Sequence, residues 1–303
     1  MIKRVFLFLL TNLAVIVLIG IMIALAEHFL GINISGYGQS YTSIFIYALI
    51  VGFSGSFISL LLSKWTAKRA YNIVLINQND LYNLSSKEKL LYDLVFDLSN
   101  RSGIKMPEVG IYESSDPNAF ATGATKNSSL VAVSTGLLNM MNENEIKGVI
   151  GHEMSHILSG DMVTMTLLQG VVNTFVVFLS RVIANLADSY FRRGNDSGGV
   201  SWIYYVVSIL LDIVLGILAS IIVMGFSRYR EYRADEGSSR FVGKENMIAG
   251  LEALKRMYEF ASDDKSKLAT MKINTKHKGG LFALFASHPD LDDRIENLRN
   301  FNY

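Results

Sequence analysis

The sequence predicts an α+β protein, a multi-pass helical membrane protein whose remaining part is mainly helical and carries a small edge β-sheet. Three observations predict this class. Four long apolar runs hold almost no charge. Most of the chain between and after them has apolar residues at helical spacing. Two short stretches, residues 109–112 and 130–134, are rich in β-branched residues and are expected to be strands.

The composition excludes some functions and limits others. Half of the 303 residues are hydrophobic, and a net charge of +1 gives no argument for a nucleic-acid partner. The chain has no cysteine, so it can form neither a disulfide nor a thiolate zinc site. Any zinc ion would have to be held by histidines and carboxylates.

The first two apolar runs, residues 5–26 and 44–62, are predicted to be transmembrane helices. The first is an uncharged run of 22 residues, enough to cross a bilayer core of about 30 Å. A cleaved signal peptide is the alternative, because Lys3 and Arg4 precede the run and 24–26 resembles a cleavage site. The run is longer than the usual apolar segment of about 7–15 residues in a signal peptide.

The other two runs, residues 162–180 and 203–226, are predicted to form a membrane hairpin. A hairpin lying in the membrane interface is the alternative. Asp212 falls within the last run, where a charge is costly. We expect Asp212 to make a helix-packing contact with Asn173 or Gln169, and a proton or substrate contact is the alternative.

Basic residues predict the orientation by the positive-inside rule. Lys3 and Arg4 precede the first run, residues 27–43 contain no lysine or arginine, and Lys64 follows the second run. The rule places the N-terminus and the part after residue 62 in the cytoplasm, although Arg192 and Arg193 argue weakly against this for the later hairpin. We expect a multi-pass protein of the cell (plasma or inner) membrane with four parts: a membrane region 1–69, a cytoplasmic part 70–161, a membrane hairpin 162–226 and a cytoplasmic part 227–303.

Capping signals and small residues organise the part around the two strands. Ser85 and Glu88 form a capping box that opens a helix, and Gly103 ends it. Residues 116–123 lie between the strands. They could form an exposed edge that binds an extended peptide through its main chain. Spacing alone favours an ordinary hairpin connection.

The stretch His152-Glu153-Met154-Ser155-His156 reads H-E-x-x-H. Histidines four residues apart share one face of a helix, so both rings can reach one metal ion. Glu153 points roughly 60° away from them and can flank the ion as a general base for water. A capping box at Asn142 and Glu145 and a stop signal at Gly160 place the motif within a helix.

Two histidines need a third ligand to make a catalytic zinc site. His28 is predicted on the other side of the membrane, and His277 lies in a lysine-rich loop. Glu231 and Asp235 are four residues apart and follow closely after the hairpin, while the motif closely precedes it. This carboxylate pair is the best source of a third ligand. Ion pairing with neighbouring arginines is the alternative.

Together these motifs resemble those of the HtpX-type membrane metallopeptidases, relatives of the CAAX prenyl proteases. The resemblance rests on His152–His156 and on three further stretches, 118–123, 227–235 and 287–289. It implies a gluzincin-like domain with one zinc ion per chain, bound by His152, His156 and Glu231. It also implies that Asp235 orients a ligand histidine. The segment that begins at Asn118, with Ala119 and Phe120, would line the substrate cleft.

The resemblance further implies a protease that cleaves misfolded or damaged membrane proteins at the cytoplasmic face, in stress response and quality control. Its expected partners are membrane-protein or unfolded polypeptide substrates, the lipid bilayer and other membrane proteases. His288, followed by a proline, is our candidate donor to the oxyanion, and a packing or capping role is the alternative. Cobalt or manganese could replace zinc.

Two other functions stay open. A site-specific processing protease would use the same residues, although four spans cannot enclose a large chamber. A non-enzymatic zinc carrier or scaffold is disfavoured because the predicted spans contain no histidine.

Overall fold

The computed structural model describes residues 2–31, 34, 40–192, 201–263 and 284–301, and the chain divides into two compact units. The first unit comprises residues 1–60 and 164–223, and the second comprises residues 61–163 and 224–303. Most described residues are helical, and a single four-stranded sheet lies in the second unit. The fold class predicted from the sequence is therefore confirmed.

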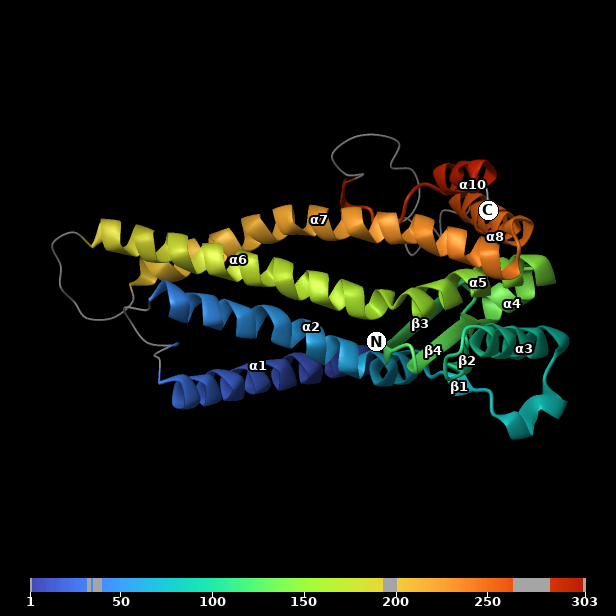
Figure 1. Cartoon of the computed structure of the whole chain (residues 1–303), viewed down its shortest axis with the longest axis horizontal. Helices are drawn as coiled ribbons and strands as arrows, with labels where there is room; N and C mark the ends of the chain where they lie inside the picture. Colours follow the sequence, from blue (N-terminus) through green and yellow to red (C-terminus); the bar gives the residue numbers. More distant parts are fainter. Residues whose placement is uncertain (1, 32–33, 35–39, 193–200, 264–283, 302–303) are drawn as a thin grey trace. The chain divides into compact units, whose positions relative to one another are not determined.

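The first unit is built from four long helices that run along one another (Figure 1). They are α1 (Ile2–Leu30), α2 (Tyr41–Tyr71), α6 (Asp161–Phe191) and α7 (Trp202–Val242). Among the described residues, α2, α6 and α7 are long and apolar enough to cross a membrane. Within α1, Val15–Leu30 is a shorter apolar stretch, so its crossing stays a prediction.

Small residues let the membrane helices approach closely. A β-carbon at Gly52 of α2 would lie 2.6 Å from the backbone nitrogen of Thr174 in α6. Gly170 of α6 in turn receives the ring of Phe53 from α2. Such contacts are typical of membrane helices, which associate through van der Waals packing because lipid is as apolar as their side chains.

The expected contact of Asp212 with Asn173 or Gln169 is wrong. Asp212 pairs with Arg181 of α6, whose Nη1 lies 3.0 Å from Oδ2, and it accepts a 2.5 Å hydrogen bond from Ser180. Gln169 donates to Asn173 on its own helix instead. The reason is that α6 continues beyond the predicted end of its apolar run and adds an arginine, which compensates a carboxylate better than an amide does.

The sheet in the second unit has the strand order β1-β2-β4-β3. Strands β2 (Glu108–Tyr112) and β4 (Ser128–Ser134) are parallel neighbours, whereas β1 (Val74–Leu75) and β3 (Ala119–Thr125) pair antiparallel at the two edges. Both predicted strands are thus confirmed. They are parallel, so the hairpin connection expected between them at residues 116–123 is wrong, and Ala119–Thr125 form the edge strand β3 instead. Gly123 has φ 144° and sits directly against Ser128 and Ser129, close to the turn from β3 into β4.

Helix α5 (Glu143–Ser159) is the central helix of the second unit. Both predicted capping boxes are present, Asn142 with Glu145 on α5 and Ser85 with Glu88 on α3 (Ser86–Arg101). Gly160 ends α5 with φ 70°. The other elements are η1 (Gln78–Asn83), α4 (Thr135–Met140), α8 (Lys244–Asp263) and α10 (Leu291–Asn300).

One hydrophobic core joins α5 to its neighbours. The buried residues come from α3, β2, β4, α5 and α8, and include Leu91, Val95, Leu98, Val109, Val131, Val133, Ile146, Ile150, Met154, Ile157, Ala253 and Met257. Because Ile150, Met154 and Ile157 face this core, a different side of α5 carries its two histidines.

Candidate metal centre and active site

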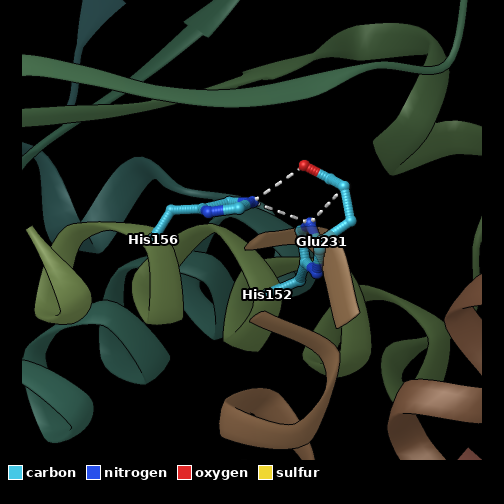
Figure 2. A group of neighbouring side chains, drawn as sticks. All are labelled: His152, His156 and Glu231. Carbon is cyan, nitrogen blue, oxygen red and sulfur yellow. Dashed lines mark hydrogen bonds and ion pairs between the residues drawn. The ribbon is translucent and has the colours of Figure 1, made fainter. Parts of the chain in front are cut away.

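Helix α5 places His152 and His156 one turn apart, with their Nε2 atoms 3.1 Å from each other. Helix α7 adds Glu231, whose Oε2 lies 3.4 Å from Nε2 of His152 and whose Oε1 lies 3.4 Å from Nε2 of His156. Figure 2 shows the two rings and the carboxylate converging on one point. The structure thus brings together the three residues expected to bind a metal.

Small residues at the crossing of α5 and α7 allow this convergence. A β-carbon at Gly237 of α7 would be 3.1 Å from the β-carbon of Ser155, and one at Gly151 would be 2.5 Å from Oγ of Ser238. Ser238 also donates a 3.0 Å hydrogen bond to a carbonyl oxygen of α5. The close approach lets the short side chain of Glu231 reach the histidines.

The distances fit a zinc ion. Ligand atoms about 2.0–2.1 Å from zinc at tetrahedral angles are roughly 3.3 Å apart. The three separations here are 3.1, 3.4 and 3.4 Å. Each oxygen of Glu231 faces one of the two Nε2 atoms, and Oε2 also lies 2.8 Å from Nδ1 of His288. A buried carboxylate between histidine nitrogens is a suitable metal-binding group.

Two further carboxylates hold the other ring nitrogens. Nδ1 of His152 lies 2.9 Å from Oδ1 of Asp235, and Nδ1 of His156 lies 2.6 Å from Oδ2 of Asp161. An acceptor at Nδ1 favours the tautomer that carries its proton there, so the Nε2 lone pairs face each other. Two lone pairs and a carboxylate at these distances need a cation between them, either a proton or a metal ion.

The pKa values of these groups reflect the same crowding. Burial lowers the pKa of His152, but hydrogen bonds with Asp235 and Glu231 outweigh burial and raise it to about 9. Burial raises the pKa of Glu231, yet its contacts with the two α5 histidines and His288 hold that pKa far below its usual range. The carboxylate of Glu231 therefore stays ionised at neutral pH and attracts a cation.

Arg294 of α10 is a site residue that the sequence reasoning missed. This buried arginine binds Asp235 through two hydrogen bonds, 2.8 Å from Nε to Oδ2 and 2.7 Å from Nη2 to Oδ1. Its Nη1 lies 3.5 Å from Oε2 of Glu231. A signal was present, because Arg294 shares the apolar face of an amphipathic helix with Leu291, Ile295 and Leu298.

Asp161 was also missed as a site residue. It directly follows the predicted stop signal at Gly160, is the first residue of α6 and contacts His156. Of the remaining histidines, His28 belongs to α1 in the other unit, and His277 lies outside the described residues.

A cavity of about 830 Å³ opens beside the histidines, and Glu153 and His288 both line it. His288 is half exposed, and its Nδ1 lies 2.8 Å from Oε2 of Glu231. Helix α8 contributes a largely apolar wall, with Met247, Gly250, Leu251 and Leu254, and this wall also includes the charged Lys255 and Glu259. A polar centre with one apolar wall is a common form of ligand pocket.

The edge strand β3 forms another wall of this cavity. Asn118 is fixed just before the strand, because its N–H donates to Oγ of Ser134 and its carbonyl accepts from the N–H of Ser134, both at 2.9 Å. Ala119 packs on the main core, while the ring of Phe120 packs against Tyr71 and Tyr112. The outer backbone edge of β3 has no neighbouring strand among the described residues.

Membrane-spanning helices and an H-E-x-x-H helix joined by a glutamate from a later helix define a membrane metallopeptidase. The family model for peptidase family M48 matches residues 85–302. The chain belongs to this family, which confirms the resemblance drawn from its motifs.

Similar proteins extend the match over nearly the whole chain. The "Protease HtpX homolog" of Methylacidiphilum infernorum is 49% identical over 302 residues, covering 98% of each chain. "Protease HtpX" of Escherichia coli is 48% identical over 304 residues, covering 99% of each chain. The crystal structure of S. mikatae Ste24p has the same fold, with a TM-score of 0.62 at 17% identity, over 98% of this chain and 67% of that chain.

Proposed function

We propose that this membrane metalloprotease is a zinc-dependent endopeptidase that degrades misfolded or damaged membrane proteins at the cytoplasmic face. One observation carries the proposal: two histidine nitrogens and the two oxygens of one glutamate converge at 3.1–3.4 Å, beside a strand edge that has no neighbouring strand among the described residues. The convergence supplies a metal site, and the strand edge supplies a place for a polypeptide.

In this proposal His152, His156 and Glu231 hold one zinc ion. When bound, zinc acidifies water and polarises the carbonyl of the scissile peptide bond. Glu153 accepts the proton of the attacking water and passes it to the leaving amine. His288, whose Nδ1 lies 2.8 Å from Oε2 of Glu231, donates a hydrogen bond to the oxyanion that forms at the scissile carbonyl.

The substrate in this proposal is an extended polypeptide that pairs with the outer edge of β3. Main-chain pairing depends little on sequence, because the backbone N–H and C=O groups are the same in every substrate. The apolar α8 wall, with Leu251 and Leu254, adds a place for an apolar side chain. Weak sequence demands and a preference for apolar residues suit unfolded segments of membrane proteins.

The cytoplasmic placement rests on the basic residues that flank the spans, Lys64 and Lys68 among them. Single cysteines can test it, since the chain has none of its own. In intact cells, a membrane-impermeant maleimide should label Ser40→Cys, between α1 and α2, and should not label Tyr82→Cys. Labelling of Tyr82→Cys from outside would show that the topology is the reverse of the one proposed.

Catalysis is tested with the purified full-length protein in detergent. Wild type should contain about one zinc per chain, Glu153→Gln should keep the zinc and lose proteolysis of an unfolded substrate, and Glu231→Ala should lose both. Full activity of Glu153→Gln would show that Glu153 is not the general base. Stoichiometric zinc in Glu231→Ala would remove Glu231 as a ligand.

Degradation and specific processing differ in their products. Several unfolded substrates should be cut at many sites with apolar neighbours, as read by N-terminal mapping of the fragments. A single fixed sequence context in all substrates would instead identify a processing protease.

A further inference from the structure

Asp161 makes the shortest contact to either α5 histidine. Its Oδ2 lies 2.6 Å from Nδ1 of His156, and its side chain is 12% exposed. It is the first residue of α6, so the contact joins the H-E-x-x-H helix to the first helix of the predicted membrane hairpin. The four stretches that carry the family resemblance do not include this residue, and the sequence around it indicates only that a helix starts here.

The two histidines have matching surroundings. Each ring gives its Nδ1 to one carboxylate, His152 to Asp235 and His156 to Asp161. Each carboxylate also faces an arginine. Arg294 binds Asp235 with two hydrogen bonds, and Nη1 of Arg230 lies 3.6 Å from Oδ2 of Asp161. The arrangement histidine–aspartate–arginine thus occurs twice around one centre.

We propose that Asp161 is a positioning residue for the metal centre, a role that rests on the metal site proposed above. By accepting the Nδ1 proton, Asp161 fixes the ring of His156 with its Nε2 lone pair turned to the centre. Carboxylate partners of this kind also make a ligand histidine more basic. Asp161 would thus do for His156 what Asp235 does for His152.

The proposal gives the hairpin a function in the metal site. Helix α6 holds one ligand histidine through Asp161, and α7 supplies both Glu231 and the carboxylate that holds the other histidine. The carboxylates that contact the two histidines, Asp161, Glu231 and Asp235, therefore stand at the start of α6 or on α7. Metal affinity should depend on how the start of α6 and this part of α7 are positioned against α5.

A simpler role for Asp161 is stabilisation of the α6 N-terminus, where an acidic residue interacts favourably with the helix dipole. The two roles predict different results. Asparagine is also well tolerated at helix starts, so Asp161→Asn changes helix stability little. The same substitution removes the charge that holds the His156 ring.

The test measures zinc affinity by chelator competition on the purified full-length protein. Asp161→Asn and Asp161→Ala should bind zinc about 10- to 100-fold more weakly than wild type. Asp97→Asn is the matched control, because Asp97 is an exposed carboxylate of α3 that pairs with Arg101 far from the site, and it should bind like wild type. The visible spectrum of the Co²⁺-loaded protein should change in both Asp161 variants and stay unchanged in the control.

Thermal unfolding separates positioning from a purely structural role. A positioning role reduces the rise in midpoint that added zinc produces, beyond any loss of metal-free stability from the altered contacts with His156 and Arg230. A lowered metal-free midpoint with an unchanged rise would overturn the inference, as would wild-type zinc affinity in both Asp161 variants. Failure of the wild-type protein to bind zinc would instead overturn the proposed metal site.

Discussion

The crossing of α5 and α8 at Gly148 allows a prediction with a worked magnitude. A β-carbon at this position would lie 2.8 Å from the carbonyl carbon of Asn246 and 3.0 Å from Cα of Met247, with the Asn246 oxygen closer still. Carbon atoms in contact are normally about 3.5–4.0 Å apart. Because the obstacle is backbone, no side-chain rotation relieves it, and Gly148→Ala must push the helices apart by roughly 1 Å.

The expected cost follows from this displacement. Overpacking of this kind destabilises by about 1–3 kcal/mol, and the better helix propensity of alanine returns about 1 kcal/mol. With a rigid obstacle we expect a net loss of about 2 kcal/mol, or roughly 4–8 °C in the unfolding midpoint. His152 follows one turn later on α5, and a shift of about 1 Å there can lower activity about 100-fold.

The assay compares thermal unfolding and proteolysis of Gly148→Ala with those of wild type. Gly216→Ala is the control, because a β-carbon at this α7 position meets no atom within 4 Å. The control should be as stable as wild type or slightly more so. If Gly148→Ala unfolds at the wild-type midpoint and cleaves at the wild-type rate, the close helix crossing does not fix the position of α5.

Three further predictions concern ion pairs. Arg294→Met should destabilise the metal-free protein by about 3–5 kcal/mol in denaturant unfolding, because the buried Asp235 loses both hydrogen bonds from its arginine and keeps only its contact with His152. Arg181→Leu should lower the unfolding temperature, whereas adding Asp212→Leu should restore it, which a double-mutant cycle measures. Burial raises the pKa of Glu108, but Lys68 and Lys64 of α2 outweigh burial and hold this pKa below its usual range. Glu108 should thus stabilise the fold at pH 7, and the stability difference between wild type and Glu108→Gln should vanish as the pH falls through the lowered pKa of Glu108.

The sequence was sufficient wherever a local pattern determines structure. The capping box at Asn142 and Glu145 and the stop at Gly160 set the limits of α5, so both histidines could be placed on one helix face. The pair Glu231 and Asp235 could be proposed as the source of a third ligand because the predicted hairpin begins shortly after the motif and ends shortly before the pair. These inferences need only helix periodicity and membrane length, whereas the choice of Glu231 within the pair came from the family resemblance.

Tertiary contacts of ordinary-looking residues could not be predicted in the same way. Arg294 reaches Asp235 across 59 residues of sequence, and nothing local distinguishes it from a surface arginine except its apolar neighbours. An aspartate after a glycine is already explained as the start of a helix, so nothing in the sequence indicates that Asp161 also contacts His156. Most residues of the strand β3 are alanine or glycine, which have little intrinsic preference for strands, and its pairing with β4 overrides that weak preference.

A single residue, Gly160, separates the last residue of α5 from the first residue of α6, and its φ of 70° suits glycine. Asp161 follows His156 by five positions. A helix turns about 100° per residue, so inserting or deleting one residue here would swing the carboxylate away from the ring whatever side chains were chosen. The turn therefore sets the spacing between His156 and Asp161. Neighbouring side chains can change, but a relative that keeps the contact between these two residues must also keep their separation of five positions.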